Sequence, residues 1–215
     1  MTIFDAASAK QMLAIGSILH TASDGAVIWG SGLNGTVPEG FHNYDSLDVR
    51  AVRGPVTRQY LLAKGIKVPE IYGDPGLLIS HLHAGRFPRQ SEYNLGIVPH
   101  YSDLSFIKDA LPDGSFVINP LRSWNEVVSD IVRCDRIISS SLHGVVVAES
   151  YGIPATLIRI SENESPLKYV DYYAGTGRDL TYCTSIGEAL VKKSWIPPIF
   201  DVDSLMNSFP YDLWK

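Results

Sequence analysis

The sequence has few cysteines and no excess of positive charge, and both shortages narrow what the protein can be. Its two cysteines, Cys134 and Cys183, lie far apart in the 215 residues and form no CxxC pair. This excludes a disulfide framework and indicates buried thiols. The net charge of −5 argues against a nucleic-acid binder that depends on phosphate contacts, so we expect no nucleic-acid partner. A few local arginines would still suffice to bind a small anion.

Long apolar runs and repeats are absent as well. No apolar stretch is long enough to cross a bilayer, so we expect at most a peripheral membrane contact. Residues 1–10 lack a basic region followed by an apolar run, and we therefore expect no secretory signal and a cytoplasmic protein. His81 and His83 have no cysteine or carboxylate partner at metal-ligand spacing, so no metal site is expected.

The sequence does contain an alternation of short apolar runs and helical patterns. Apolar residues at helical spacing predict an amphipathic helix over 6–19. The predicted strands lie at 26–29, 47–52, 94–98, 116–119, 136–139 and 155–160. The other predicted helices lie at 55–64, 103–110, 124–133, 142–151, 166–173, 186–193 and 202–209. Such alternation predicts an α/β fold with parallel sheets and helices on both faces.

The polar segment 81–92, rich in arginine and histidine, is the best candidate for a linker between two halves. We therefore expect an N-terminal half over 1–88 and a C-terminal half over 89–199. Residues 200–215 would form a C-terminal helix. This helix either crosses back onto the N-terminal half or meets another subunit, and the sequence leaves the oligomeric state open.

The run Ser139–Gly144 joins an apolar strand to an apolar helix. Serines at such a turn are natural N-caps, and the amides of a first helical turn favour an anion. His143 on the same turn can titrate near neutral pH, so it is the strongest candidate for an acid or base. The other residues predicted to bind substrate in this turn are Ser140, Ser141, Leu142 and Gly144.

A G-x-G-x-x-G pattern begins at Gly30, directly after a predicted strand. A proline- and glycine-rich loop follows it, and the next strand carries Arg50 and Arg53 where a dinucleotide site needs an acidic residue. We expect Gly30, Ser31 and Gly32 to let the backbone approach a ligand. The guanidinium groups of Arg50 and Arg53 suit a carboxylate or phosphate, with surface ion pairing as the alternative.

Two further polar residues follow predicted strands. His100 ends a buried strand, and Asp74 lies in the turn Gly73-Asp74-Pro75. A lone histidine more often serves as a hydrogen-bonding residue, and Gly-Asp-Pro is ordinary turn chemistry. At the carboxyl ends of strands, however, both residues are candidates for a catalytic base.

Several segments together resemble the polysaccharide pyruvyl transferase family. The matching stretches, which follow the family's order, are Trp29–Gly32, Val52–Pro55, Gly73–Pro75, Leu95–His100, Ser139–Pro154 and Lys168–Tyr173. The resemblance implies two Rossmann-like halves in an arrangement like that of the GT-B glycosyltransferases. It implies transfer of a pyruvyl group from phosphoenolpyruvate to two hydroxyls of a glycan or lipid-linked sugar, giving a cyclic ketal.

The resemblance also suggests roles for the candidate residues. Arg53 and the Ser139–Gly144 turn would hold the carboxylate and phosphate of the donor. His143 would act as general acid or stabilise the leaving phosphate, and His100 or Asp74 would act as base. No cofactor is needed beyond phosphoenolpyruvate, which is the donor substrate.

Two departures from the family pattern keep other functions open. Many relatives have Arg-Leu-His where this chain has Ser141-Leu142-His143, so Arg53, Arg50 or Arg159 would have to compensate. Relatives also usually begin with a further strand, so we expect a shortened N-terminal half. The alternatives are a GT-B-type glycosyltransferase that uses a nucleotide-sugar, with Glu149 as its ribose ligand, and a non-catalytic member of the family. An Arg53 paired off in the core would favour the non-catalytic alternative.

Overall fold

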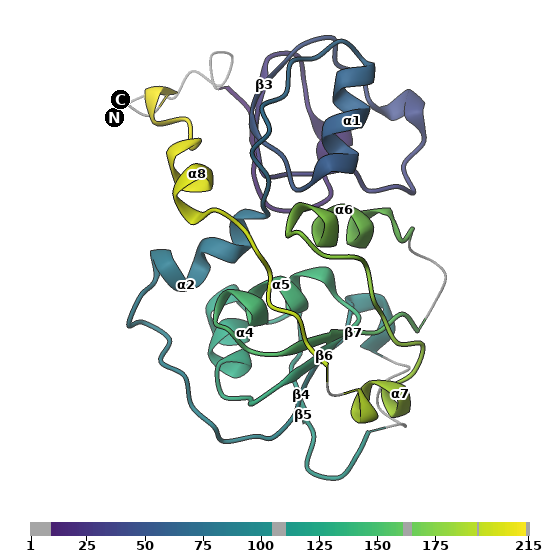
Figure 1. Cartoon of the computed structure of the whole chain (residues 1–215), viewed down its shortest axis with the longest axis vertical. Coiled ribbons are helices and arrows are strands. Elements are labelled where there is room, and N and C mark those ends of the chain that lie inside the picture. Colours follow the sequence, from purple (N-terminus) through teal and green to yellow (C-terminus); the bar gives the residue numbers. More distant parts are fainter. Residues whose placement is uncertain (1–9, 105–110, 161–164, 193, 214–215) are drawn as a thin grey trace. The chain divides into compact units, whose positions relative to one another are not determined.

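Two units, each with its own parallel sheet, make up the computed structural model (Figure 1). The model describes residues 10–104, 111–160, 165–192 and 194–213. Unit 1 comprises Met1–Pro75, Ser165–Gly177 and Phe200–Lys215, and unit 2 comprises Gly76–Glu164 and Arg178–Ile199. The predicted α/β class with two parallel sheets is confirmed.

Unit 1 is built on a three-stranded sheet in the order β1-β2-β3, with all strands parallel. The central strand β2 is buried along its whole length, as its apolar sequence Ala-Val-Ile-Trp requires. The strands are β1 (Met12–Leu13), β2 (Ala26–Trp29) and β3 (Leu47–Ala51). The helices are α1 (Pro55–Ala63), α6 (Leu167–Gly175) and α8 (Val202–Asn207). Single 3-10 turns lie at Leu19–Thr21, Glu39–Phe41 and Tyr211–Leu213, and another spans Pro75–Leu78.

The helix predicted over 6–19 is wrong where the structure describes it, because Met12 and Leu13 form β1 beside β2. Ile15, part of the supposed apolar stripe, is 50% exposed, and Gly16 has a φ of 112° that no α-helix accommodates. The expected lack of a strand before Ala26 is wrong for the same reason. Residues 6–9 lie outside the described part of the chain.

Helix α1 has the boundaries that its sequence predicts. Pro55 occupies its first turn, where a missing N–H costs nothing, and Gly65 follows its last residues with a φ of 78°. The helix packs against α6, although more than a hundred residues separate them in the sequence. The N-cap residue Gly54 has no side chain, so another residue must satisfy the free amides of α1.

Asp171 on α6 supplies that group. Its carboxylate accepts hydrogen bonds from Thr57 N (3.0 Å) and Thr57 Oγ1 (2.7 Å) in the first turn of α1. It also accepts one from Arg53 Nε (3.0 Å), and both side chains of this ion pair are fully buried. Arg53 Nη1 donates to Ser17 Oγ (2.5 Å) and Nη2 to Leu33 O (2.8 Å). Arg53 therefore joins four segments of unit 1.

Glycines allow the backbone to close around this pair. A Cβ at Gly54 would collide with the Asp171 carbonyl, and a Cβ at Gly175 would collide with the Arg53 carbonyl. A Cβ at Gly32 would lie 2.6 Å from Arg53 Cζ. The Val-Arg-Gly-Pro motif at Val52–Pro55 and Gly32 thus allow the close contact between α1, α6 and Arg53.

Unit 2 is built on a four-stranded parallel sheet in the order β5-β4-β6-β7. Its strands are β4 (Gly96–Val98), β5 (Phe116–Val117), β6 (Ile137–Ser139) and β7 (Ala155–Leu157). Its helices are α2 (Ile79–Leu82), α4 (Trp124–Ile131), α5 (Leu142–Ser150) and α7 (Ile186–Val191), with a 3-10 turn at Tyr101–Asp103. Helix α5 packs on β6 and β7, and α4 packs on α5 (Figure 1). Most of the helix predicted over 103–110 lies outside the described residues.

The division between the units differs from the sequence expectation. The predicted linker 81–92 lies inside unit 2, because Phe87 is buried against Val128 and Val132 of the α4 region. Helix α6, which we assigned to the C-terminal half, belongs to unit 1 through the Asp171 contacts. Residues Phe200–Lys215 also belong to unit 1, where Trp29 Nε1 donates to Leu205 O (2.9 Å).

Both cysteines are free and buried, as predicted. Cys134 follows α4 and Cys183 pairs in an isolated bridge with Ile158. Burial raises the pKa of Cys134 to about 12 and also raises the pKa of Cys183. Neither thiol is therefore a candidate nucleophile.

In unit 1, the buried side chain of His42 contacts two tyrosines, Tyr44 and Tyr60. His42 is buried, and its Nδ1 lies 3.1 Å from Tyr44 Oη, while its ring centroid lies 5.2 Å from that of Tyr60. Burial lowers the pKa of His42 below its ordinary value of 6.5, Lys64 lowers it further, and Glu39 opposes the shift. The folded protein therefore favours neutral His42.

We expect the buried ion pair to matter far more to stability than an exposed one. Asp171→Asn should lower the free energy of unfolding by about 3–5 kcal/mol, because it leaves the Arg53 charge buried without a counter-ion. Arg50→Gln breaks the exposed pairs with Asp48 and Asp212 and serves as the matched control, with an expected loss of about 0–1 kcal/mol. Urea titration followed by circular dichroism measures both. Equal losses in the two variants would contradict the structural role of the pair.

We also expect unit 1 to lose stability as the pH falls below about 7. The unfolded chain protonates His42 near pH 6.5, whereas the folded chain resists protonation until a lower pH, so protons favour unfolding in that window. His42→Gln should flatten the dependence of the denaturation midpoint on pH between about 7.5 and 5.5. His81→Gln, at an exposed position of α2, is the control. Parallel curves for the His42 variant and the unaltered protein would refute this assignment.

Candidate functional site

The order of the strands in unit 2 indicates which edge of the sheet would bind a ligand. The chain runs from β4 outward to β5 and then returns to β6 on the other side of β4. Parallel sheets bind ligands outside the carboxyl ends of the strands at such a reversal. The segments that follow β4 and β6 contain His100 and Ser140, two of the residues selected from the sequence. We call these segments, with the first turn of α5, the switch-point site.

Hydroxyl groups join the two segments directly. His100 N donates to Ser140 Oγ (2.8 Å), and Ser140 N donates to Val98 O (3.2 Å). Ser139 Oγ lies 2.7 Å from Val98 O and accepts a hydrogen bond from Ser141 N (3.0 Å). These bonds fix the ends of β4 and β6 against each other, so the two segments form one structure.

Helix α5 begins at this point without a side-chain cap. Ser141 is its N-cap residue, and its side chain makes no capping hydrogen bond. The first amides of the helix therefore have no intrahelical acceptor, which favours an anion in front of them. Leu142 is buried and offers only its backbone, whereas His143 is partly exposed. Gly144 has a packing role, because a Cβ there would collide with Ser139 Oγ.

His100 is held by a short chain of polar groups. Its Nδ1 lies 2.8 Å from Ser102 Oγ, and Ser102 Oγ donates to Asp103 Oδ1 (3.2 Å). Ser102 N also donates to His100 Nδ1 (3.4 Å), so Nδ1 acts as an acceptor at the start of the 3-10 turn. These contacts fix the orientation of the imidazole ring. Ser102 and Asp103 were not selected from the sequence, where a helix was expected from residue 103.

Arg159 reaches the same edge of the sheet from the next strand. It comes two residues after β7, which pairs in parallel with β6. Its guanidinium carbon lies 5.3 Å from the ring centroid of Tyr182, and its backbone N donates to Cys183 O (2.9 Å). Arg159 was considered only as a substitute for a missing arginine. Its position directly after an apolar strand was the signal for a larger role.

The candidates in unit 1 are held by protein contacts. Ser31 Oγ donates to Gly16 O (2.9 Å), and Gly32 borders the Arg53 guanidinium. A Cβ at Gly30 would collide with Pro75, so this glycine serves close packing. Arg53 is paired in the core, as described above. Contact of these residues with substrate stays a prediction, and the same holds for Arg50 and Asp74.

Arg50 and Asp74 also lie in unit 1. Arg50 forms ion pairs with Asp48 (2.6 Å) and Asp212 (2.9 Å), which is the alternative that we considered for it. Asp74 is buried in the turn that precedes Pro75. The switch-point site belongs to unit 2, so these two residues form no part of it.

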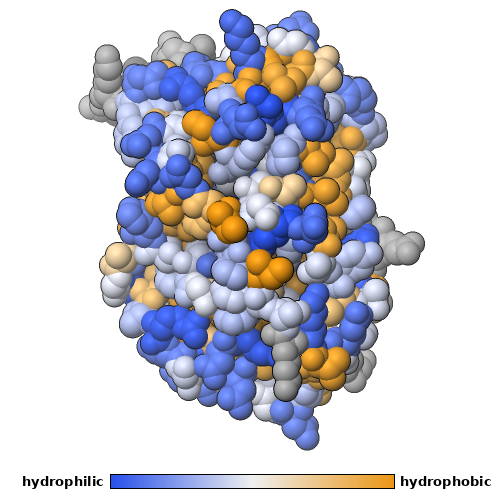
Figure 2. Space-filling view, viewed as in Figure 1, coloured by the Kyte–Doolittle hydropathy of each residue, from blue (hydrophilic) through white to orange (hydrophobic). Residues whose placement is uncertain are grey.

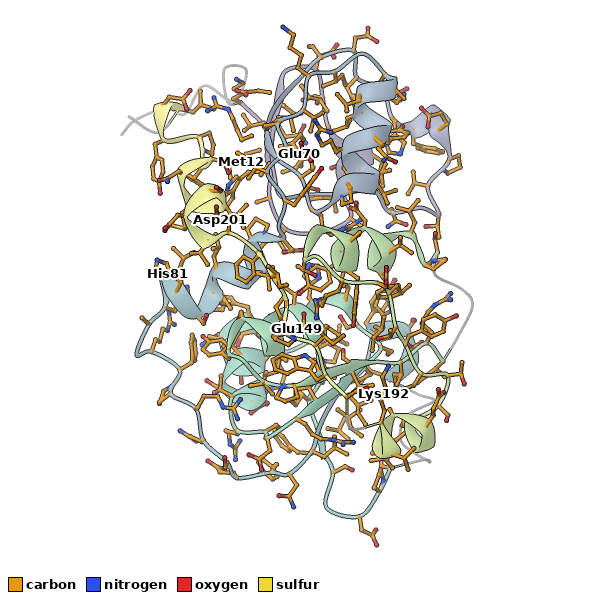
Figure 3. All side chains as sticks on the ribbon, viewed as in Figure 1. Met12, Glu70, His81, Glu149, Lys192 and Asp201 are labelled. Atoms are coloured by element: carbon orange, nitrogen blue, oxygen red, sulfur yellow. The ribbon has the colours of Figure 1, made fainter. Side chains whose placement is uncertain are left out.

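Glu149 lies in the interior of unit 2, on α5 (Figure 3). Arg178 donates to both of its carboxylate oxygens, with distances of 2.6 and 2.8 Å, and Trp195 Nε1 donates to Oε1 (3.3 Å). Both oxygens are therefore engaged in a buried ion pair. This arrangement argues against Glu149 as a ribose ligand.

The described residues contain neither a metal-binding cluster nor a helix that could cross a membrane. No group of three histidine, cysteine or carboxylate side chains could hold a metal ion there. No helix in the same ranges is long and apolar enough to cross a membrane.

Comparison with known proteins places the chain in a family. Residues 5–162 match the family described as polysaccharide pyruvyl transferase. An uncharacterized protein, L143, of Acanthamoeba polyphaga mimivirus is 29% identical over 206 residues, which cover 89% of this chain and 71% of that protein. The succinoglycan biosynthesis protein ExoV of Rhizobium meliloti is 27% identical over 170 residues, which cover 75% of this chain.

This chain matches only 52% of the length of ExoV. No solved structure matches the chain. The family match spans most of the chain, including β1 to β7 and the whole switch-point site. The chain therefore belongs to the polysaccharide pyruvyl transferase family.

Proposed function

We propose that this protein transfers a pyruvyl group from phosphoenolpyruvate to two hydroxyls of a sugar in an exopolysaccharide or cell-surface glycan. The family and the relative in succinoglycan biosynthesis support a role of this kind. The observation that carries the proposal is the hydrogen bond from His100 backbone N to Ser140 Oγ, which joins the two segments at the switch point beside the start of α5, whose N-cap side chain makes no capping hydrogen bond. We further propose a cytoplasmic protein whose two units pair in a GT-B arrangement.

The reaction needs one proton donor and one acceptor. Protonation of the methylene carbon of phosphoenolpyruvate gives a cationic centre at the adjacent carbon. One sugar hydroxyl adds to that carbon, and the second displaces the phosphate and closes the ketal. One hydroxyl proton replaces the proton given to carbon, and the other leaves with the phosphate. The products are therefore the ketal and inorganic phosphate.

The switch-point site offers groups for each part of this reaction. The amides of α5 with Ser140 and Ser141 suit the phosphate of the donor. Arg159 suits its carboxylate, because a guanidinium binds a carboxylate through two parallel bonds. His143 would donate the proton, and the imidazole of His100, which Ser102 holds in place, would accept one.

The two other functions are less well supported. A nucleotide-sugar donor calls for a carboxylate at the ribose, and Glu149 is occupied by Arg178. Arg53 was expected to bind substrate but is paired in the core, and such a pairing is the observation that would favour a non-catalytic role. The match across the switch-point site weighs against that role, because its polar groups do not depend on Arg53.

We expect phosphoenolpyruvate to bind in a calorimetric titration. A uridine diphosphate-sugar, the donor in the alternative function, is titrated separately. Arg159→Gln should weaken the binding of phosphoenolpyruvate roughly 10- to 100-fold, the contribution of a hydrogen bond to a charged group. Arg133→Gln, which removes an arginine already paired with Glu92, is the matched control and should bind as the unaltered protein does. Binding of the nucleotide-sugar alone would move the assignment to glycosyl transfer. No binding of either ligand would support the non-catalytic role.

His143→Ala should reduce kcat by roughly 10²- to 10⁴-fold while leaving the fold intact, because a general acid contributes about that much. The assay follows phosphate release in the presence of an acceptor glycan. His81→Ala, which removes an exposed histidine of α2, should turn over normally. Near-normal turnover by the His143 variant would rule out its role as acid.

A further inference from the structure

One segment of unit 2 carries positive charge on a protein that is negative overall. Residues 81–90 contain two arginines, Arg86 and Arg89, and two histidines, with no acidic residue. Arg86 and Arg89 are exposed, and neither forms an ion pair with a carboxylate of the described residues. Arg122 and Arg133 nearby are paired with acidic residues. The segment therefore presents charge that its surroundings do not neutralise.

Exposed apolar side chains adjoin this charge. Trp124, the first residue of α4, is 51% exposed, and Arg86 lies over its ring at 5.1 Å. The His83 ring lies 5.2 Å from the same ring, so the segment and α4 form one surface. Leu82 is 53% exposed and Leu121 is 71% exposed, and each is close in sequence to a residue of this cluster. We call it the α2–α4 surface, which comprises His81, Leu82, His83, Arg86, Arg89, Leu121 and Trp124.

The position of this surface relates it to the switch-point site. The loop with Leu121 follows β5, and β5 pairs in parallel with β4. The carboxyl ends of β5 and β4 therefore lie on the same edge of the sheet, and His100 follows β4. His81 lies on the outer side of α2 (Figure 3). On the face drawn in Figure 2, apolar residues occur in small groups between polar ones. The α2–α4 surface combines an exposed tryptophan and two exposed leucines with arginines that form no ion pair with the described carboxylates.

We propose that the α2–α4 surface binds the surface of an anionic lipid bilayer. Tryptophan is enriched at the membrane–water interface, and the two leucines can enter the acyl boundary. Arg86 and Arg89 complement the phosphates of acidic headgroups. A neutral glycan has no charge to match the arginines and no apolar chain to match the leucines. Such binding is peripheral, and it brings the switch-point site to an acceptor held in a bilayer. Only this last consequence rests on the proposed function.

Sedimentation with vesicles tests this surface. The full chain should bind vesicles of phosphatidylcholine with phosphatidylglycerol, should bind phosphatidylcholine alone only weakly, and should be released by salt. Arg86→Gln with Arg89→Gln should lower the partition coefficient roughly 30-fold. Trp124→Ser should lower it as well. Arg122→Gln, whose charge is already paired, is the matched control and should change it little.

Two further variants separate loss of charge from loss of folding, and vesicle binding from the proposed activity. Lysine at both positions, Arg86→Lys with Arg89→Lys, should retain binding, which shows that charge is the cause and that folding is intact. His143→Ala should bind vesicles normally, so failure of the proposed activity does not affect this test. Absence of binding to anionic vesicles would overturn the proposal. Vesicle binding that the glutamine variants leave unchanged would also overturn it. A third contrary outcome is binding of a soluble glycan that depends on Trp124, without any binding to vesicles.

Discussion

Unit 1 depends on a buried ion pair between Arg53 and Asp171, which are 118 residues apart in the sequence. Two fully buried charges are stable only as a complete pair with further hydrogen bonds, and Thr57, Ser17 and the Leu33 carbonyl supply these. The same carboxylate satisfies the first turn of α1, where Gly54 offers no side chain. The pair therefore fixes the start of α1, the end of β3 and the position of α6 at once. Gly54 and Gly175 follow from it, because any side chain there would separate the charges.

A second buried pair, between Glu149 and Arg178, performs the same task in unit 2. Arg178 comes seven positions after Asp171, directly after the segment Ser165–Gly177 that belongs to unit 1. One short stretch of chain therefore carries the anion that anchors it to unit 1 and the cation that anchors it to unit 2. Both pairs use residues that would look like ligand-binding groups in the sequence alone. Their burial shows that charge in this chain first determines the fold, and only the remaining charges are available for substrate.

Local sequence patterns predicted the strands and helices whose formation depends on residues close together in the sequence. The strands at Ala26–Trp29 and Ile137–Ser139, and the helix at Leu142–Ser150, were predicted because apolar runs and turn residues bound them. The hydrogen bond between His100 N and Ser140 Oγ was not predicted, although the sequence placed both residues after strands of one parallel sheet. The two-residue strand β1 was missed because its few apolar residues also fit a helix. The role of Arg53 was missed because its partner lies on a helix far along the chain.

The proposed chemistry of the switch-point site depends on which arginines lie at its edge of the sheet. Many relatives are expected to have an arginine where this chain has Ser141, and Arg53 cannot move to replace it without leaving Asp171 buried and unpaired. Arg159 follows a strand of the same sheet as the switch-point site. A donor would then be held by one arginine, by hydroxyls and by helix amides. Amides in fixed positions need no reorganisation as charge develops on a leaving phosphate. Under the proposed function, the absence of the arginine would therefore affect binding of the donor more than the chemical step.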